Sequence, residues 1–280
     1  MPDVMDLSEL FFISLGAAVV VYYVVKLLIS SRMLFPKLWF PLPKTFFTSM
    51  GEWAGDKTGQ RVKVIVTDFT KENVFGEITD ELKDLNIGVL INNVGMLPSF
   101  IPSRFLECAD LDQTITNVIN CNVKTMAKMC RIILPGMANR GKGLIVNISS
   151  GVACIPFPLY TLYTASKVFV ERVSQGLQAE YKVNGIIIQA VAPFGVSTRM
   201  AAYQQTNIVT PTPEDFVKRS LQYLRAGDKT HGSICHTLMG WFLLSVPLKL
   251  LYAESMLHSL QDYVKKKTSI SASSATFENK

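Results

Sequence analysis

Apolar positions along this 280-residue chain fall into runs of different length, and each length predicts a different element. Leu10 to Ile29 is almost entirely apolar and, at about 20 residues, is long enough to span a bilayer as a helix. The β-branched runs that begin at Gly143 and Ile186 predict buried strands. The long mixed stretch Leu111 to Met137 predicts a helix ahead of the first of these strands.

The same alternation of strand and helix patterns starts earlier in the chain. Val62 to Val66 is predicted as a strand with Asp68 at its end. Lys71 to Leu85 is predicted as an amphipathic helix, and Ile87 to Ile91 as the next strand. Alternating strands and helices are typical of an α/β fold with a parallel sheet.

Charges around the first apolar run predict its orientation. Acidic residues precede it and basic residues follow it: Asp3, Asp6 and Glu9, then Lys26, Arg32, Lys37 and Lys44. The positive-inside rule therefore places the bulk of the chain in the cytosol. A cleaved signal peptide is the alternative, but the run lacks a basic leader and an A-x-A site.

A second apolar stretch, His236 to Tyr252, is interrupted by Pro247 and is short for a membrane span. Two interpretations stay open for it, a wall of a substrate pocket or a helix on a membrane surface. The Ser/Thr-rich tail from Lys265 is predicted to lack regular structure. We divide the chain into an anchor (1–31), a linker with the remnant of a missing segment (32–61), a core (62–236) and an apolar segment with a polar tail (237–280).

Three side chains around the strand that begins at Gly143 form a candidate catalytic group. Ser150 follows this strand, at the end where parallel sheets collect ligands. Tyr163 and Lys167 are four residues apart and share one face of the next predicted helix. A neighbouring ammonium favours the phenolate, so we expect Lys167 to lower the pKa of Tyr163 and make it a general acid or base. Ser150 is expected to hydrogen-bond a substrate oxygen.

The Y-x-x-x-K spacing alone is weak, because the chain contains it at Tyr22 and Tyr263 as well. The first of these lies in the apolar run and the second in the basic tail. What distinguishes the Tyr163 instance is a serine upstream at a strand end and a helix that carries the pair.

With these residues the chain resembles the short-chain dehydrogenase/reductase family, whose S-(x12)-Y-x-x-x-K signature matches Ser150, Tyr163 and Lys167. Asn92-Asn93-Val94-Gly95 is similar to the family's N-N-A-G motif, and Asn122 matches the asparagine of its proton relay. Pro193 to Thr198 resembles P-G-x-V-x-T, with Phe194 in place of glycine. The segment P-K-T-F-F-T-S-M-G-E-W-A and the apolar N-terminus resemble membrane-bound members that reduce apolar ketones.

The resemblance implies a Rossmann-like, doubly wound parallel sheet with an N-terminal transmembrane helix, located in the endoplasmic reticulum membrane. It implies NADPH as cofactor, a hydrophobic ketone substrate and a possible homodimer. The catalytic residues carried over are Ser150, Tyr163, Lys167 and Asn122. The cofactor-binding residues carried over are Asp68, Asn92, Asn93, Gly95, Lys167, Pro193, Val196 and Thr198.

One family motif is missing, the T-G-x-x-x-G-x-G turn that cradles the cofactor's pyrophosphate. Only eight residues separate Trp53 from Val62, and their glycines (Gly55 and Gly59, with Gly51 before them) have the wrong spacing. No strand is predicted before them and no helix directly after them, so they do not form a phosphate-binding helix N-terminus. We therefore expect a sheet truncated by the loss of its first strands.

Composition excludes several other functions. The net charge of +6 is spread along the chain, and no interleaving of aromatic and basic residues indicates nucleic-acid binding. The five cysteines lack a C-x-x-C, so neither a disulfide framework nor a zinc site is predicted. The three histidines, His231, His236 and His258, have no metal or triad pattern and are interpreted as structural or solvated.

Three functional hypotheses follow from the resemblance. The first is NADPH-dependent reduction of a steroid 17-ketone. The second is reduction of a very-long-chain 3-oxoacyl-CoA. The third is a shortened isoform, or an incomplete gene model, that keeps the catalytic residues but does not bind the cofactor.

Overall fold

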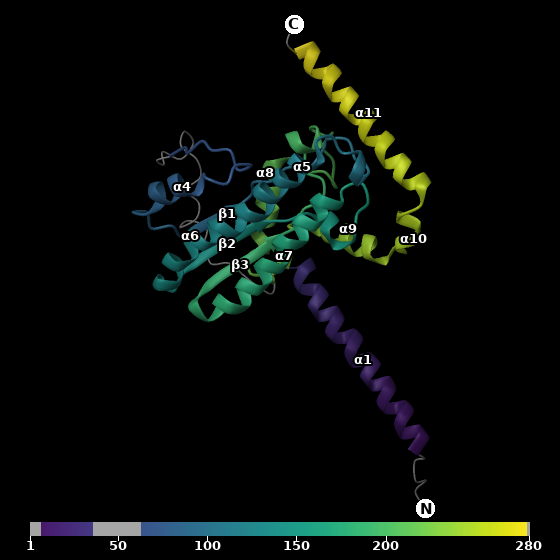
Figure 1. The fold of residues 1–280 in the computed structure, drawn as a ribbon. Coiled ribbons are helices and arrows are strands. Elements are labelled where there is room, and N and C mark those ends of the chain that lie inside the picture. Colours follow the sequence, from purple (N-terminus) through teal and green to yellow (C-terminus); the bar gives the residue numbers. More distant parts are fainter. Residues whose placement is uncertain (1–6, 36–62, 279–280) are drawn as a thin grey trace, which may run out of the picture.

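The computed structural model describes residues 7–35 and 63–278, and its centre is a parallel four-stranded sheet in the order β1-β2-β3-β4. The strands are β1 Val89–Asn92, β2 Gly143–Ile148, β3 Ile186–Val191 and β4 Lys229–Thr230. The helices are α1 Leu7–Leu34, α4 Phe75–Leu82, α5 Leu111–Val118, α6 Thr125–Arg140, α7 Thr161–Tyr181, α8 Pro213–Ser220, α9 Ile234–Ser245, α10 Leu248–Leu251 and α11 Glu254–Glu278. Figure 1 shows their arrangement.

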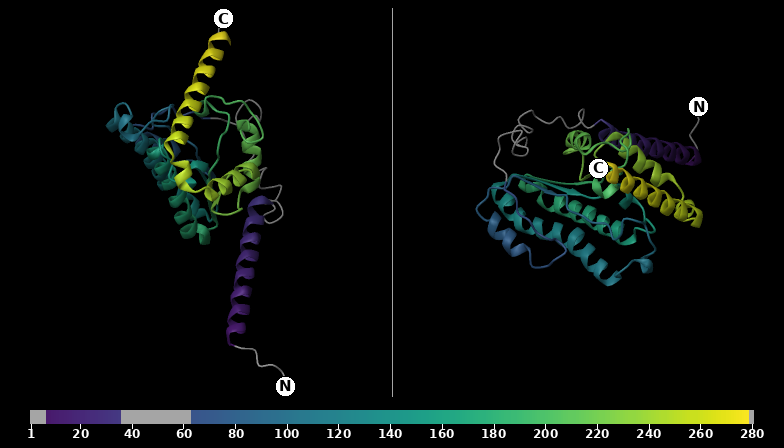
Figure 2. Two further views of the ribbon diagram at one scale, coloured as in Figure 1. Left: turned by 90° about the vertical axis from the view of Figure 1, so that its right-hand side faces the viewer. Right: turned by 90° about the horizontal axis from the view of Figure 1, so that it is seen from above.

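Helices cover both faces of the sheet, as the α/β prediction requires (Figure 2). On one face, α6 and α7 pack on a core that includes Ile145, Ile188 and Met137, none of which is exposed. On the other face, Phe216 of α8 packs against Leu144 and Val146 of β2. The fold is therefore a Rossmann-like layered sheet.

The predicted helix Leu111 to Met137 is present as one helical stretch, but it is not uniform. A π-helical turn, Ile119–Lys124, joins α5 to α6. Such a turn adds a residue to the helical repeat and is often found at functional sites. It buries Asn120, Cys121 and Asn122.

The start of α8 is fixed by an N-cap residue and a proline. Thr212 is the N-cap residue, and its side chain accepts a hydrogen bond from the Asp215 amide at 3.1 Å. Pro213 occupies the first helical position, where its missing N–H has no partner to lose. The capped helix places Phe216 against the sheet.

Helix α1 includes a 22-residue segment, Ile13–Leu34, that is long and apolar enough to cross a membrane. None of this segment's most apolar window is buried against the rest of the chain. In Figure 1 the helix projects away from the layered sheet. A helix that is apolar all round and makes so few contacts with protein is typical of a membrane span.

The strand predicted over Val62 to Val66 is wrong for the residues that the structure describes. Residues 63–68 form neither strand nor helix, and Val64 and Val66 are 77% and 88% exposed. An alternating pattern forms a strand only if a neighbouring strand pairs with it, and β1 pairs with β2 alone in the described part of the chain. Val62, Gly51, Gly55, Gly59 and the linker 36–61 lie outside the described residues.

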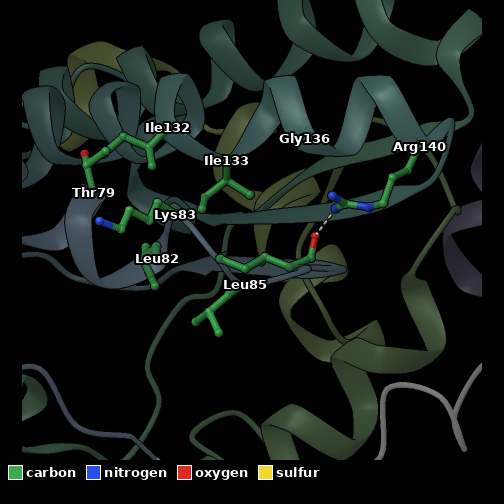
Figure 3. A pocket seen from close by; sticks show the side chains of 9 residues that line it. Thr79, Leu82, Lys83, Leu85, Ile132, Ile133, Gly136 and Arg140 are labelled. Carbon is green, nitrogen blue, oxygen red and sulfur yellow. Dashed lines mark hydrogen bonds between the residues drawn. The ribbon is translucent and has the colours of Figure 1, made fainter.

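The helix that follows is shorter than predicted, because α4 covers only Phe75–Leu82 of the stretch Lys71 to Leu85. A cavity of about 240 Å³ lies between α4 and α6 (Figure 3). Apolar side chains of both helices line it, including Leu82, Ile132 and Ile133. Arg140 closes one side by donating a hydrogen bond of 2.5 Å to the Ile87 carbonyl. This side of the molecule is packed less completely than the β2–β3 side.

The tail prediction is also wrong, since α11 continues through Lys265 to Glu278. The segment is polar, but it contains neither glycine nor proline, the two residues that most disfavour a helix interior. A polar segment without glycine or proline can therefore form a helix.

Candidate active site

The carboxyl ends of β1, β2 and β3 meet at one edge of the sheet, where the predicted site residues gather. Pairing between β2 and β3 continues past the ends of the strands. The Ser149 amide donates to the Val191 carbonyl at 2.8 Å, and the Gly151 amide donates to the Pro193 carbonyl at 2.7 Å. The backbone of Ser150 is thereby held extended, just before a short helical turn, and Ser150 is almost fully buried.

Tyr163 and Lys167 face this edge from the first turns of α7. The Lys167 Nζ lies 5.7 Å from the centre of the Tyr163 ring and donates a hydrogen bond of 3.0 Å to the Ile148 carbonyl. The Ser150 side chain hydrogen-bonds with the Tyr163 hydroxyl. The structure therefore brings the serine, the phenol and the ammonium together as predicted.

The expected lowering of the phenol pKa is wrong for this structure. Burial raises the pKa of Tyr163, and the hydrogen bond with Ser150 opposes that shift only in part. Burial also lowers the pKa of Lys167 to about 8, because a desolvated ammonium is disfavoured. Spacing predicted the proximity of the two groups, whereas desolvation of both decides the direction of their shifts.

Asn122 reaches the site from the π-helical turn and is 2% exposed. Its Oδ1 accepts from the Met96 amide at 2.8 Å, and its Nδ2 donates to the Met96 carbonyl and the Ser166 Oγ, both at 3.0 Å. The amide thus fixes the segment after β1 against α7. A methyl group at Gly95 would lie 3.1 Å from the Lys167 Nζ, so glycine keeps that approach open.

The other residues predicted from the N-N-V-G motif divide between core and surface. Asn92 at the end of β1 donates to the Asn147 Oδ1 at 2.8 Å, so its side chain pairs within the sheet. Asn93 is exposed. Asp68 is exposed too, and hydrogen bonds from Thr70 to its carboxylate lower the pKa of Asp68. Asn120 binds the Thr70 carbonyl at 2.8 Å and ties this turn to the π-helical turn.

Pro193, Val196 and Thr198 follow β3 and border the same edge. The Pro193 carbonyl binds the turn after Ser150, and Val196 packs on the core next to α8. The Thr198 carbonyl accepts from the Tyr203 amide at 2.9 Å and closes a turn of the following loop. Their assignment to a cofactor site stays a prediction from the P-G-x-V-x-T resemblance.

Sequence reasoning missed what surrounds Phe194. Its ring stacks on His231 and meets His236 edge-on, with centroids 5.6 Å and 6.0 Å away. His236 is fully buried in α9; its Nδ1 accepts from the Phe194 amide at 3.3 Å, and its Nε2 lies 2.8 Å from the Val209 carbonyl. The interpretation of His231 and His236 as structural agrees with this packing. Their partners are distant in sequence, so spacing carried no signal.

The described residues fit one end of a nicotinamide cofactor better than the other. Gly95 and the Lys167 ammonium lie together beside the Tyr163 ring, and the family resemblance assigns both residues to the cofactor site. Across residues 63–278, in contrast, no glycine-rich turn leads from a strand into a helix N-terminus at this edge. Nor do the residues described there include a His, Cys, Asp and Glu cluster that could hold a metal ion.

Comparison with known proteins identifies what the chain is similar to. A family model described as short chain dehydrogenase matches residues 49–208. The 17-beta-hydroxysteroid dehydrogenase type 3 of Danio rerio is 47% identical over 302 aligned positions, which cover 93% of this chain and 98% of that protein. A very-long-chain 3-oxoacyl-CoA reductase from Anas platyrhynchos is 44% identical over 69% of this chain and 62% of its own length.

Among solved structures, a short-chain dehydrogenase from Sphingobium yanoikuyae in complex with NADPH superposes with a TM-score of 0.58 and 27% identity. It covers 71% of this chain and 78% of its own. The alignment with the Danio rerio protein has 302 positions and is longer than this 280-residue chain. This chain therefore has gaps opposite residues of that protein.

Proposed function

Because this chain belongs to the short-chain dehydrogenase family, we propose that its site is built to reduce the ketone of an apolar substrate, with NADPH as hydride donor. The substrate we propose is a steroid 17-ketone, in a reaction of the androstenedione-to-testosterone type. The observation that carries the proposal is the Tyr163 phenol, held beside the Ser150 hydroxyl and the Lys167 ammonium at the carboxyl edge of the sheet.

The side chains of this chain divide the work on the ketone oxygen. Ser150 donates a hydrogen bond to that oxygen and orients it. Tyr163 gives up its proton as negative charge develops there, and the Lys167 ammonium stabilises the phenolate that forms. Because burial raises the pKa of Tyr163, the phenol stays protonated at neutral pH until negative charge develops on the ketone oxygen. Asn122, which fixes the segment after β1 against α7, and Lys167 would relay a replacement proton from water to the Tyr163 phenolate.

The cofactor, when bound, supplies the hydride that adds to the ketone carbon. Gly95, Lys167, Pro193, Val196 and Thr198 would hold its nicotinamide end. Asn92 would support these residues from within the sheet, through its hydrogen bond to Asn147. Asn93 and Asp68 are exposed and would contact the adenosine end. We assign no phosphate ligand, since the described residues offer no turn of the kind that neutralises pyrophosphate.

The choice of a steroid over an acyl-CoA rests on the extent of similarity. The steroid dehydrogenase aligns with this chain over nearly its whole length, whereas the 3-oxoacyl-CoA reductase does so over 62%. Helix α1, which is long and apolar enough to cross a bilayer, supports a membrane location, for which we propose the endoplasmic reticulum with α1 as anchor and the sheet facing the cytosol. Reduction of very-long-chain 3-oxoacyl-CoA is the second candidate.

We further propose that this chain binds NADPH poorly as it stands. Two observations support this. The first is the stretch 63–68, which pairs with no strand among the described residues and exposes Val64 and Val66, although a strand is predicted there. The second is the set of gaps that the alignment with the steroid dehydrogenase leaves in this chain. The chain would then be a shortened form that retains a reductase's catalytic side chains.

The test of the catalytic assignment is Tyr163→Phe, measured as testosterone formed from androstenedione and NADPH in microsomes. The assay uses this chain and a variant with a family nucleotide-binding segment restored between Trp53 and Val62. We expect kcat of the active form to fall at least about a hundredfold, since the proton donor is lost while packing is kept.

Tyr160→Phe is the matched control, because Tyr160 lies one turn earlier at the start of α7 with its ring 6.5 Å from that of Tyr163. It should leave kcat nearly unchanged. If Tyr163→Phe kept more than about a tenth of the activity, the proposed proton donor would be wrong.

A further inference from the structure

Helices α9 and α10 expose apolar side chains that none of the described residues covers. Phe242 is 72% exposed, Leu250 61% and Leu244 59%. Further exposed apolar side chains on the same two helices are Ile234, Leu238 and Leu248. Six exposed apolar side chains on two consecutive helices are more than the scattered exceptions found on most surfaces, and such concentrations mark contacts with another phase or molecule.

The pattern on α9 is directional. Ile234, Leu238 and Phe242 are each four residues apart and so share one stripe of the helix. The opposite side carries the buried His236, Thr237 and Gly240, which pack toward the site. No Asp, Glu, Lys or Arg occurs between Lys229 and Lys249. The stripe therefore faces outward, and no charged side chain within α9 favours its exposure to water.

The surface lies beside the membrane helix. The C-terminal end of α1 contacts α9. Both figures place α9 and α10 at the end of the layered sheet from which α1 projects (Figures 1 and 2). If α1 crosses a bilayer, α9 and α10 are thus carried to the surface of that bilayer.

We propose that α9 and α10 lie in the surface of the bilayer that α1 crosses and form a second, non-spanning membrane contact. A 12-residue helix is about 18 Å long, well short of the about 30 Å of a bilayer's hydrocarbon core, so α9 does not span it. An apolar stripe with charge only at its margin suits the boundary between headgroups and acyl chains. Lys249, exposed on α10, and Arg32, in the last turn of α1, would meet the phosphate groups.

The contact also gives α9 two roles from its two faces. His236 on the inner face holds the Phe194 amide at 3.3 Å, and the Phe194 ring packs against Gly151, next to Ser150. The outer face carries Phe242. His236 and Phe194 therefore connect the helix proposed to meet the lipid with the residue that follows Ser150.

Trp241 allows a test in the full-length chain without any measurement of turnover. The chain has three tryptophans, and the variant Trp39→Phe/Trp53→Phe leaves Trp241 on α9 as the single fluorophore. This protein is reconstituted into phosphatidylcholine vesicles, with and without doxyl-labelled phosphatidylcholine. We expect the labelled lipid to quench Trp241 about twofold or more, because the indole then lies among acyl chains.

Two further variants separate the proposed contact from mere proximity to α1. Adding Phe242→Glu and Leu250→Glu should abolish most of the quenching, since both side chains are exposed and their replacement removes apolar contact without touching the core. Val66→Glu is the matched control, since Val66 is 88% exposed and precedes α4, a helix that Figure 1 draws far from α9. It should leave the quenching unchanged. Circular dichroism of each variant checks that it remains folded.

Three results would overturn the proposal. In the first, labelled lipid does not quench Trp241 while aqueous iodide does. In the second, neither quenches it and protection grows with the protein-to-lipid ratio, in which case a second copy of the chain covers the surface. In the third, quenching survives Phe242→Glu/Leu250→Glu, in which case α1 alone holds α9 near the bilayer. None of these outcomes depends on the proposed reaction.

Discussion

The sheet differs sharply between its β2–β3 half and its β1 side. Five of the six residues of β2 and five of the six of β3 are buried, whereas only Leu90 of the four in β1 is. Ile91 in β1 is 51% exposed, and the stretch before α4 exposes Val64 and Val66. The first half is packed from both faces, while the second lacks a cover on one face within the described residues.

This contrast separates two tasks that the family combines. The side chains proposed to move the proton stand on the well-packed half, at the ends of β2 and on α7. The side chains expected to bind the outer part of the cofactor, such as Asp68 and Asn93, stand on the open half and are exposed. A chain can therefore keep a well-formed catalytic group while its cofactor site is incomplete.

The largest effect should appear in NADPH affinity. Loss of two charge-assisted hydrogen bonds to the pyrophosphate, at about 2 kcal/mol each, corresponds to an affinity about a thousandfold weaker. NADPH fluorescence titration should show this difference between this chain and the Danio rerio 17-beta-hydroxysteroid dehydrogenase type 3 prepared in the same way. A low micromolar Kd for this chain would mean that another loop cradles the phosphates.

A smaller difference should separate core substitutions in the two halves. Ile145→Ala in β2 removes a side chain with no exposure and should lower the free energy of unfolding by about 3 kcal/mol. Ile91→Ala in β1 should lower it by less than about 1 kcal/mol, because half of that side chain is already in water. Denaturant unfolding of both variants in detergent tests the contrast, and equal losses would show that β1 is as well covered as β2.

The smallest effect concerns Lys167, whose burial lowers its pKa from 10.5 to about 8. Between these values the unfolded chain holds a proton that the folded chain has released, so stability rises with pH. Relative to Lys167→Met, the wild-type chain should gain about 2 kcal/mol of unfolding free energy between pH 8 and 9.5. Unfolding curves across that range test this. A flat difference would show that Lys167 is solvated, and a falling one that the fold stabilises its ammonium.

The sequence predicted the packed half well because local and long-range preferences agree there. β2, β3 and α7 carry strong patterns, and the carboxyl edge of a parallel sheet then brings Ser150, Tyr163 and Lys167 together. Val62 to Val66 failed because a strand requires a neighbour, and no pattern within five residues reports whether one exists. The direction of the Tyr163 pKa shift failed because burial is a property of the whole fold.

The contacts of Phe194 have an evolutionary consequence. A methyl group at Gly151 would lie 2.5 Å from the Phe194 ring, so any side chain there would require the ring to move. The phenylalanine, which stands where the family usually has glycine, thus restricts residue 151 to glycine. The two positions form a linked pair: a descendant of this chain can diversify beside its catalytic serine only after it has given up the aromatic ring at position 194.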